Sequence, residues 1–184
     1  MFRETYKKHC ALLLISVIII GCLLKIEEYD YSASVEILER RADEVWTFMA
    51  NFSNMKHLNP TIISFEIVSE IKNVNSWKYS VKYEERLSHW PYVRNYATAN
   101  IVTDFNYSDD IHFINSTHRT CFLKNTFCLE SKGTFLIHSN LLNSVVCKEH
   151  VIYQCPIFMS LLCLREVVYQ RNHILGNLKK HFDN

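Results

Sequence analysis

Residues 145–182 read VVCKEHVIYQCPIFMSLLCLREVVYQRNHILGNLKKHF, and they join the two patterns that decide the fold. From Val145 to Cys155 every second residue falls on the same face, and this spacing of two is the period of a β-strand. After Pro156 the apolar spacing changes to three and four residues, which predicts one long helix over Phe158–Phe182. The apolar stripe of this helix consists of Leu161, Leu164, Val168, Leu175, Leu178 and Phe182. The pattern therefore predicts a strand followed by a helix that lies across a sheet.

The sequence before residue 145 supplies the rest of that sheet. Ser32–Leu38 alternates apolar and polar residues and predicts a first strand. Helical spacing then predicts two short helices, over Ala42–Phe52 and Asn54–Leu58. Further alternating runs predict the remaining strands, which are Ile62–Glu70, Trp77–Leu87, Tyr92–Thr103, Asp110–Asn115 and Phe127–His138. We expect an α+β fold in which a curved antiparallel sheet of about seven strands wraps around the C-terminal helix, with the two short helices after the first strand.

The overall composition is that of one globular domain. The chain has 184 residues, 48% of them hydrophobic and 21% charged, with a net charge of +1. A net charge this close to zero gives no basis for binding nucleic acid. The five Cys outside residues 10–24 form no CxxC pair, and neither an HExxH sequence nor a glycine-rich phosphate loop is present. We expect no metal, no cofactor and no nucleic-acid partner, and we expect a monomer.

An uncharged apolar segment, CALLLISVIIIGCLL, spans residues 10–24. It predicts an N-terminal unit, residues 1–26, that is a membrane-spanning signal anchor or a cleaved signal peptide, followed by one domain over residues 27–184. The run Ile19–Cys22 also resembles a bacterial lipoprotein cleavage site. Basic residues precede the segment and acidic residues follow it. This places the domain on the lumenal or extracellular side of a membrane contacted by residues 10–24, or makes the protein secreted if the segment is cleaved.

Three Asn-x-Ser/Thr triplets begin at Asn51, Asn106 and Asn115. Such triplets are acceptors for N-linked glycosylation in secreted and lumenal proteins. Asn106 precedes Ser108 and two Asp residues that read as a turn, so it is the best placed of the three. We expect glycosylation at these positions if the domain is lumenal.

Local likeness to one superfamily agrees with the order of elements. The stretches that carry it are Val35–Ile37 with Ala42–Phe48 and Asn59–Pro60, then Trp90–Tyr96, and finally Glu149–Pro156 leading into the terminal helix. Together they resemble the START/polyketide cyclase superfamily (SRPBCC, helix-grip) over residues 32–182. Trp90–Tyr96 is similar to the segment of START lipid-transfer domains in which a Pro is followed by Arg-Asp, with Asn95 in place of the Asp. The resemblance implies a sheet curled around the C-terminal helix, with a cavity for sterols, phospholipids, polyketides or similar ligands.

Strand and helix phase, together with the resemblance, select the candidate ligand-binding residues. They are Trp77, Tyr79, Tyr83, Glu85, Arg94, Glu149, Tyr153, Arg171 and Leu175. Glu85, Glu149 and Arg171 are charges on otherwise apolar faces, and an unpaired buried charge is very costly. We therefore expect Arg171 to pair with Glu85 or Glu149 and to present a polar anchor to a ligand head group. The other interpretation is that these charges lie at the cavity mouth or brace the helix on the sheet.

The resemblance predicts the binding or transfer of a lipid or other apolar small molecule by a membrane-tethered protein. The alternative is a polyketide cyclase-like or hydrolase-like enzyme that uses acid and base residues of the cavity, for which Glu149 and Tyr83 are candidates. No nucleophile elbow or dinucleotide fingerprint is present. We therefore assign no catalytic residue.

Overall fold

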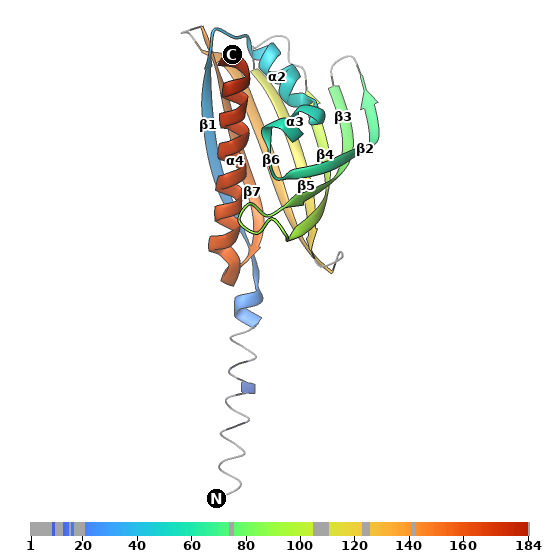
Figure 1. The fold of residues 1–184 in the computed structure, drawn as a ribbon, viewed down its shortest axis with the longest axis vertical. Coiled ribbons are helices and arrows are strands. Elements are labelled where there is room, and N and C mark those ends of the chain that lie inside the picture. Colours follow the sequence, from blue (N-terminus) through green and yellow to red (C-terminus); the bar gives the residue numbers. More distant parts are fainter. Residues whose placement is uncertain are drawn as a thin grey trace, which may run out of the picture.

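The computed structural model describes residues 9, 13–14, 16, 21–73, 76–104, 111–122, 126–140 and 143–183. In this part of the chain a seven-stranded antiparallel sheet has the strand order β1-β7-β6-β5-β4-β3-β2. The sheet curls around the long helix α4, and α2 and α3 lie over the opening of the curl (Figure 1). The elements are β1 (Ile26–Leu38), α2 (Ala42–Ala50), α3 (Phe52–Leu58), β2 (Ile62–Lys72), β3 (Ser76–Arg86), β4 (Arg94–Asp104), β5 (Ile111–Phe122), β6 (Phe127–Asn140), β7 (Ser144–Pro156), η1 (Ile157–Met159) and α4 (Ser160–Asp183).

The predicted fold class is confirmed, and β7 and α4 form its centre. β7 is buried at nearly every second residue because its inner face meets the helix, and it pairs with β1 from Ile26↔Pro156 to Leu38↔Ser144. β1 begins at Ile26, earlier than the predicted Ser32, because Tyr29 and Tyr31 continue the alternation and pack beside Tyr153. The first and last strands of the fold therefore lie side by side.

Only the C-terminal half of the predicted helical stripe is buried. Leu175, Leu178 and Phe182 belong to the core, whereas Leu161 is 80% exposed and Leu164 is 40% exposed. In the first turns of α4 a different face, Met159, Cys163 and Val167, packs against Val151, Tyr153 and Cys155 of β7. A straight helix repeats every 3.6 residues, so a row of alternating three- and four-residue steps drifts around its surface. The predicted stripe is therefore wrong for the first half of the helix.

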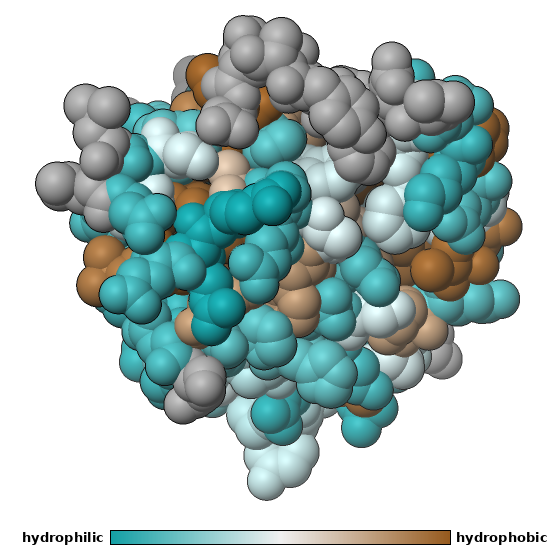
Figure 2. Space-filling view, turned by 90° about the horizontal axis from the view of Figure 1, so that it is seen from above, coloured by the Kyte–Doolittle hydropathy of each residue, from teal (hydrophilic) through white to brown (hydrophobic). Residues whose placement is uncertain are grey.

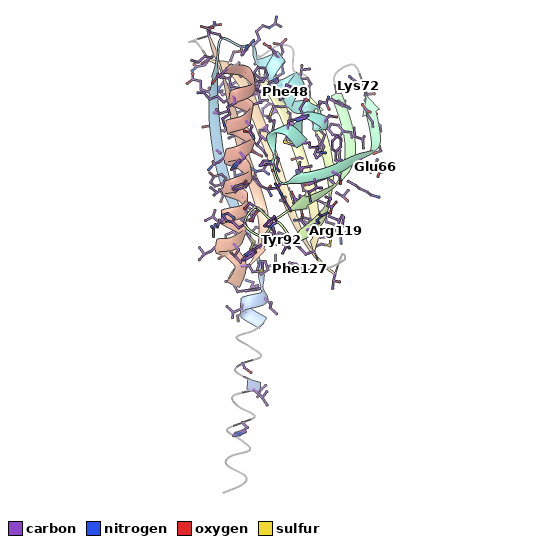
Figure 3. All side chains as sticks on the ribbon, viewed as in Figure 1. Phe48, Glu66, Lys72, Tyr92, Arg119 and Phe127 are labelled. Atoms are coloured by element: carbon purple, nitrogen blue, oxygen red, sulfur yellow. A yellow bond between two sulfur atoms is a disulfide. The ribbon has the colours of Figure 1, made fainter. Side chains whose placement is uncertain are left out.

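The two short helices close the core at one end. α2 buries Val45, Trp46 and Met49, and Asn51 caps α3 by accepting a hydrogen bond from the Ser53 N–H at 3.0 Å. Phe48 of α2 stacks on His181 of α4, with ring centroids 4.1 Å apart (Figure 3). Seen from this end, the surface is mostly hydrophilic (Figure 2). The buried apolar side chains of α2 and of the C-terminal half of α4 face the interior of the domain.

Two disulfides link neighbouring elements of the described chain. Cys121 pairs with Cys128 across the β5–β6 hairpin, and Cys155 pairs with Cys163, which joins β7 to the first turns of α4. Cys147 is a buried free thiol. The second bridge fixes the helix face that packs against β7, and for this reason Cys163 rather than Leu161 or Leu164 lies inward.

The predicted membrane-spanning helix is not supported. Most of residues 10–24 lie outside the described residues, as does Asn106. Within the described part of the chain, no helix is both long enough and apolar enough to cross a membrane. This finding contradicts the expectation of a transmembrane signal anchor, which rested on apolar composition alone.

Candidate ligand-binding cavity

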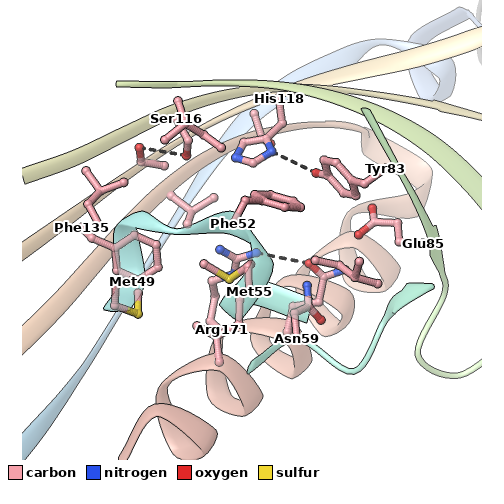
Figure 4. Close-up of a pocket in the computed structure, with 18 of the residues that line it drawn as sticks. Met49, Phe52, Met55, Asn59, Tyr83, Glu85, Ser116, His118, Phe135 and Arg171 are labelled. Carbon is pink, nitrogen blue, oxygen red and sulfur yellow. Dashed lines mark hydrogen bonds between the residues drawn. The ribbon is translucent and has the colours of Figure 1, made fainter. Parts of the chain in front are cut away.

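A cavity of about 120 Å³ lies between the inner face of the sheet, the two short helices and α4 (Figure 4). Its apolar wall consists of Met49, Phe52, Met55, Ile62, Ile101, Ile114, Phe135, Val151 and Ile174. Its polar wall consists of Asn59, Tyr79, Tyr83, Glu85, Ser116, His118, Thr120, Ser131, Gln170 and Arg171. A cavity that combines apolar walls with convergent polar groups is a usual form of a small-molecule site.

The strand β5 turns polar where it faces this cavity. Ser116, His118 and Thr120 continue the inward face begun by Ile114, so the strand runs to Phe122 rather than ending at the predicted Asn115. Gly133 of β6 lies opposite Ser116, where a Cβ would approach the Ser116 Oγ to 2.9 Å. The glycine therefore leaves room for the serine hydroxyl, which donates a hydrogen bond to the Gly133 carbonyl oxygen at 3.3 Å.

Arg171 extends from α4 toward β7 and forms a hydrogen-bonded ion pair with Glu149. The Glu149 side chain is 1% exposed, whereas that of Arg171 is 19% exposed. A second guanidinium nitrogen of Arg171 donates to the Gln170 Oε1 at 3.2 Å. Of the two partners considered for Arg171 from the sequence, the structure pairs it with Glu149. Burial raises the pKa of Glu149, although the Arg171 charge and hydrogen bond oppose this rise.

Glu85 lies on the inner face of β3 and is 7% exposed. Its Oε1 accepts a hydrogen bond from the Nδ2 of Asn95, the residue paired with it on β4, at 3.2 Å. Burial raises the pKa of Glu85 to about 7, while the Arg171 charge and the Asn95 hydrogen bond oppose the rise. Asn95 thus has a physical role, because an Asp at this position would place a second carboxylate against Glu85.

Tyr83 and His118 form a hydrogen bond across the cavity, with 2.9 Å between the Tyr83 Oη and the His118 Nδ1. Burial and then the Arg171 charge lower the pKa of His118 to about 4. The imidazole is therefore neutral near pH 7, with one nitrogen as donor and the other as acceptor. Burial raises the pKa of Tyr83 well above its usual value, so the phenol keeps its proton.

The connection between β3 and β4 is fastened to α4 near the polar side of the cavity. The Ser88 N–H and hydroxyl both donate to the Glu166 carboxylate, at 2.9 and 2.7 Å. His89 lies 3.5 Å from the same carboxylate and packs edge-on against the Tyr169 ring. Farther along the connection, Tyr92 is exposed. Glu166 therefore holds this loop against the helix that carries Arg171.

Several solved structures share this architecture. A START superfamily protein from Mycobacterium smegmatis matches with a TM-score of 0.54 at 10% identity, over 84% of this chain and 97% of that chain. A conserved protein from Geobacillus kaustophilus matches with a TM-score of 0.59 at 10% identity, over 84% and 95% of the two chains. The di-domain ARO/CYC BexL from the BE-7585A biosynthetic pathway matches with a TM-score of 0.54 at 10% identity, over 85% of this chain and 50% of that chain.

The chain has a START-like, helix-grip fold. No protein-family model matches it, and no curated protein matches it in sequence. At about a tenth identity, the structural likeness concerns the fold alone. What the START-like cavity binds must therefore be argued from the side chains of this chain.

Five of the nine predicted residues belong to the START-like cavity or its direct support. Tyr79, Tyr83, Glu85 and Arg171 line it, and Glu149 holds Arg171. The Tyr79 hydroxyl is itself used in the fold, since it donates to the Ala50 carbonyl oxygen at 2.6 Å. Burial raises the pKa of Tyr79.

The other four predicted residues lie outside the described cavity wall. Arg94 is exposed on the outer face of β4 and pairs with Glu84 at 2.9 Å, because the neighbouring Asn95 takes the inward position. Trp77 packs against the edge of the core, with the Lys72 Nζ over its ring. Tyr153 stacks on Tyr29 in the separate cluster beside the first turns of α4, and Leu175 is a core residue of the same helix.

Sequence reasoning missed the polar residues that β5 and β6 contribute, above all His118 and Ser131. The signal for His118 was the continued alternation of Ile114, Ser116 and His118, which a search for apolar faces passes over. No group of three or more His, Cys, Asp or Glu side chains that could hold a metal ion occurs among the described residues.

Two of the three sequon asparagines have assigned positions. Asn51 caps α3, and its Oδ1 is occupied by the Ser53 N–H. Asn115 lies exposed on the outer face of β5, where its Oδ1 accepts a hydrogen bond from the Thr134 hydroxyl at 3.0 Å. Glycosylation at these positions stays a prediction, with Asn115 more accessible than Asn51.

Proposed function

We propose that this protein binds an apolar small molecule inside its START-like cavity and acts by holding it rather than by changing it. The observation that carries the proposal is a cavity with an apolar wall on one side and a polar wall that includes Glu85 and Arg171 on the other. Arg171 also forms a buried ion pair with Glu149. Such a pair is weak evidence for stability, since well-packed apolar residues often stabilise a core as well or better. The proposal gives the Arg171–Glu149 pair another role, which is to present Arg171 to a polar group of the ligand.

Four residues are proposed to contact the ligand. Tyr79 and Tyr83 supply ring surface, while Glu85 and Arg171 supply the polar anchor. Glu149 acts as a positioning residue, because its hydrogen bond holds the Arg171 guanidinium. The lipid expected from the sequence is one member of the class of apolar small molecules.

The proposal is tested by filling the cavity. Val151 lines it from β7, whereas the adjacent Ile152 is half-buried on the opposite face of the same strand. The full chain and its Val151→Phe and Ile152→Phe variants are incubated with a mixture of uncharged small molecules and examined by native mass spectrometry. Bound mass on the wild type and on Ile152→Phe, but not on Val151→Phe, is expected. Equal binding by all three folded proteins would place the ligand elsewhere and overturn the proposal.

A second candidate function is acid–base catalysis in the same cavity. It is favoured by the Tyr83–His118 hydrogen bond, since 2.9 Å is a proton-transfer distance and a neutral imidazole can accept a proton. An enzyme converts its bound compound into a different compound over repeated turnovers, whereas a carrier returns it unchanged. A new product that His118→Gln abolishes would favour the enzyme, and unchanged compounds would favour the carrier.

We also propose that the domain of residues 27–184 folds in an oxidising compartment, lumenal or extracellular, as a secreted protein would. The support is the two disulfides, which persist in such compartments and are rare in the cytosol. Alkylation of the unreduced protein from its native source should leave Cys121, Cys128, Cys155 and Cys163 unmodified. Modification of these four thiols before any reduction would contradict the proposal.

A further inference from the structure

The size of the cavity restricts what it can hold. Its volume is about 120 Å³, whereas pockets for drug-sized ligands measure roughly 300–1,000 Å³. An engineered cavity of about 150 Å³ in another protein binds benzene. The cavity therefore has room for a single ring. A sterol or the acyl chains of a phospholipid would require the sheet and α4 to separate.

The wall of this space suits a flat, polarisable ligand. Phe52 and Phe135 face it from α3 and β6, and the Phe52 ring lies 5.5 Å from that of Tyr83. Aromatic rings at such spacings favour a further ring in a stacked or edge-on position. Met49 and Met55 add thioethers, which make favourable contacts with aromatic ring edges. An aromatic ring thus gains more from this wall than a saturated chain of equal volume.

The charges around the cavity favour an uncharged ligand. The positive charge of Arg171 is balanced by its ion pair with Glu149. His118 is neutral near pH 7, because its pKa is lowered to about 4. An anionic ligand would lie beside the Glu85 carboxyl group, and a cationic ligand would lie beside the Arg171 guanidinium. Either ligand would therefore be buried next to a group that can carry its own charge, which is costly.

One buried polar group at the cavity has bonding capacity to spare. Glu85 uses its Oε1 for the Asn95 amide, and no hydrogen bond to its Oε2 is found among the described residues. Figure 4 shows the carboxyl group of Glu85 directed toward the cavity, near Tyr83. Glu85 is only 7% exposed, so its carboxyl group gains from a ligand that completes its hydrogen bonding.

We infer that the ligand is an uncharged compound of about one aromatic ring, with a hydroxyl group that hydrogen-bonds to the free oxygen of Glu85, which makes it a phenol-like molecule. The inference rests on the proposed function and names the ligand class of the same cavity. A hydroxyl group both donates and accepts, so it bonds to Glu85 in either protonation state. A carbonyl group only accepts, so it bonds to Glu85 only when the carboxyl group carries a proton.

The surroundings of Glu85 set the pH above which the binding of a carbonyl compound should differ from the binding of a hydroxyl compound. Glu85 is surrounded by Arg171 and Glu166 of α4, Tyr83 of β3, His118 of β5 and the paired Asn95 of β4. Its pKa is about 7. Affinity for a ring-sized ketone should therefore fall as the pH rises through about 7, whereas affinity for a phenol should change little.

The first experiment compares four probes of similar size with the full chain near pH 6.5, by NMR titration. The probes are phenol, toluene, benzoate and cyclohexanone. Phenol is expected to bind about tenfold more tightly than toluene, which has the same shape without the hydroxyl. Benzoate should bind at least tenfold more weakly than phenol. Raising the pH to 8.5 should weaken cyclohexanone severalfold and leave phenol nearly unchanged.

Two variants assign these differences to Glu85. Glu85→Leu should abolish the roughly tenfold preference for phenol over toluene, so that the two compounds bind about equally. Glu85→Gln replaces the carboxyl group with an amide of the same shape, which donates a hydrogen bond at every pH. Its affinity for cyclohexanone should therefore not fall above pH 7. The wild-type pH comparison keeps the inference falsifiable if Glu85→Leu does not fold. Because each readout is a ratio between probes or between pH values, a merely structural role for Glu85 would not change it.

The outcomes separate this inference from the function on which it rests. Toluene binding as tightly as phenol, or benzoate binding more tightly, would overturn the inference. So would binding of palmitic acid or cholesterol without binding of phenol. If Val151→Phe blocks that lipid, the proposed function stands and only the ligand class is wrong. If none of these compounds binds, or if Val151→Phe has no effect on binding, the proposed function fails as well.

Discussion

Arg171 on α4 and Glu149 on β7 form an ion pair that crosses from the helix to the sheet inside the domain. Glu149 lies between Cys147 and Val151 on the inner face of β7, so water has almost no access to its charge. The pair therefore connects the helix that closes the cavity to the strand at its back. A change to either residue affects both the stability of the core and the polar side of the cavity.

Replacement of Arg171 by methionine should be strongly destabilising. The variant leaves the Glu149 carboxyl group buried without its partner, and breaking a buried pair in this way costs about 3–5 kcal/mol. The free energy of unfolding in urea measures the loss. Arg165→Met on the exposed face of α4 is the matched control and should change it by less than about 0.5 kcal/mol. The double variant Arg171→Met/Glu149→Met should recover most of the loss. No recovery would show that Arg171 stabilises the fold through another contact.

Glu85 should make the protein less stable as the pH rises. Its pKa is raised to about 7 in the folded protein, so the folded state holds a proton that the unfolded state loses above about pH 4.5. This contribution is complete below pH 4.5 and is lost as the pH rises through 7. Glu85→Gln should therefore be more stable than the wild type at pH 8, by up to about 3 kcal/mol, and similar at pH 4.5. The exposed Glu66→Gln is the control. A difference that does not depend on pH would contradict the buried carboxyl group.

His118 should make the protein more stable as the pH rises. Its pKa is lowered to about 4, so below about pH 6.5 the unfolded state binds a proton that the folded state does not bind. Stability from the neutral ring is complete above pH 6.5 and is lost as the pH falls toward 4. His118→Gln should remove this loss, which amounts to up to about 3 kcal/mol. Because Glu85 and His118 oppose each other between pH 4.5 and 6.5, the wild type should change little there.

The two variants should therefore show slopes of opposite sign. Over this range the stability of Glu85→Gln should rise with pH, and that of His118→Gln should fall with pH. Urea unfolding at half-unit pH intervals measures both slopes, and the exposed His57→Gln serves as the control for His118. Slopes of the same sign would mean that one of the two side chains reaches bulk water.

The residues that could be predicted from the sequence are those governed by a strict period. In a strand the side chains alternate without drift, so phase alone assigned Glu85 and Glu149 to the interior. The mid-helix position of Arg171 between Val168 and Leu175 was enough to direct it toward the sheet. The same reasoning assigned Trp77 and Tyr153 to inner faces, but it could not say how far along the strand the cavity extends.

Other features depend on contacts that no local pattern encodes. The inward face of the first half of α4 is determined by the Cys155–Cys163 bridge and by packing on Tyr153, whereas the sequence predicted the row through Leu161 and Leu164. The β5 cavity wall was missed because Ser116 and His118 are polar, and a residue facing a cavity need not be apolar. Arg94 faces outward because the neighbouring Asn95 takes the inward position, where it donates a hydrogen bond to Glu85.

The helix face that differs from the sequence prediction provides a direct test of the packing. Leu161 and Leu178 both belong to the predicted stripe, but Leu161 is 80% exposed and Leu178 is fully buried. Leu178→Ala should lower the free energy of unfolding by about 2–5 kcal/mol, because it opens a space in the core that its neighbours fill only in part. Leu161→Ala should change it by less than about 0.5 kcal/mol. Both substitutions keep a good helix former, so helix propensity is matched, and urea unfolding of the full chain measures both changes. A loss at Leu161 comparable to that at Leu178 would mean that another part of the protein covers the first turns of α4.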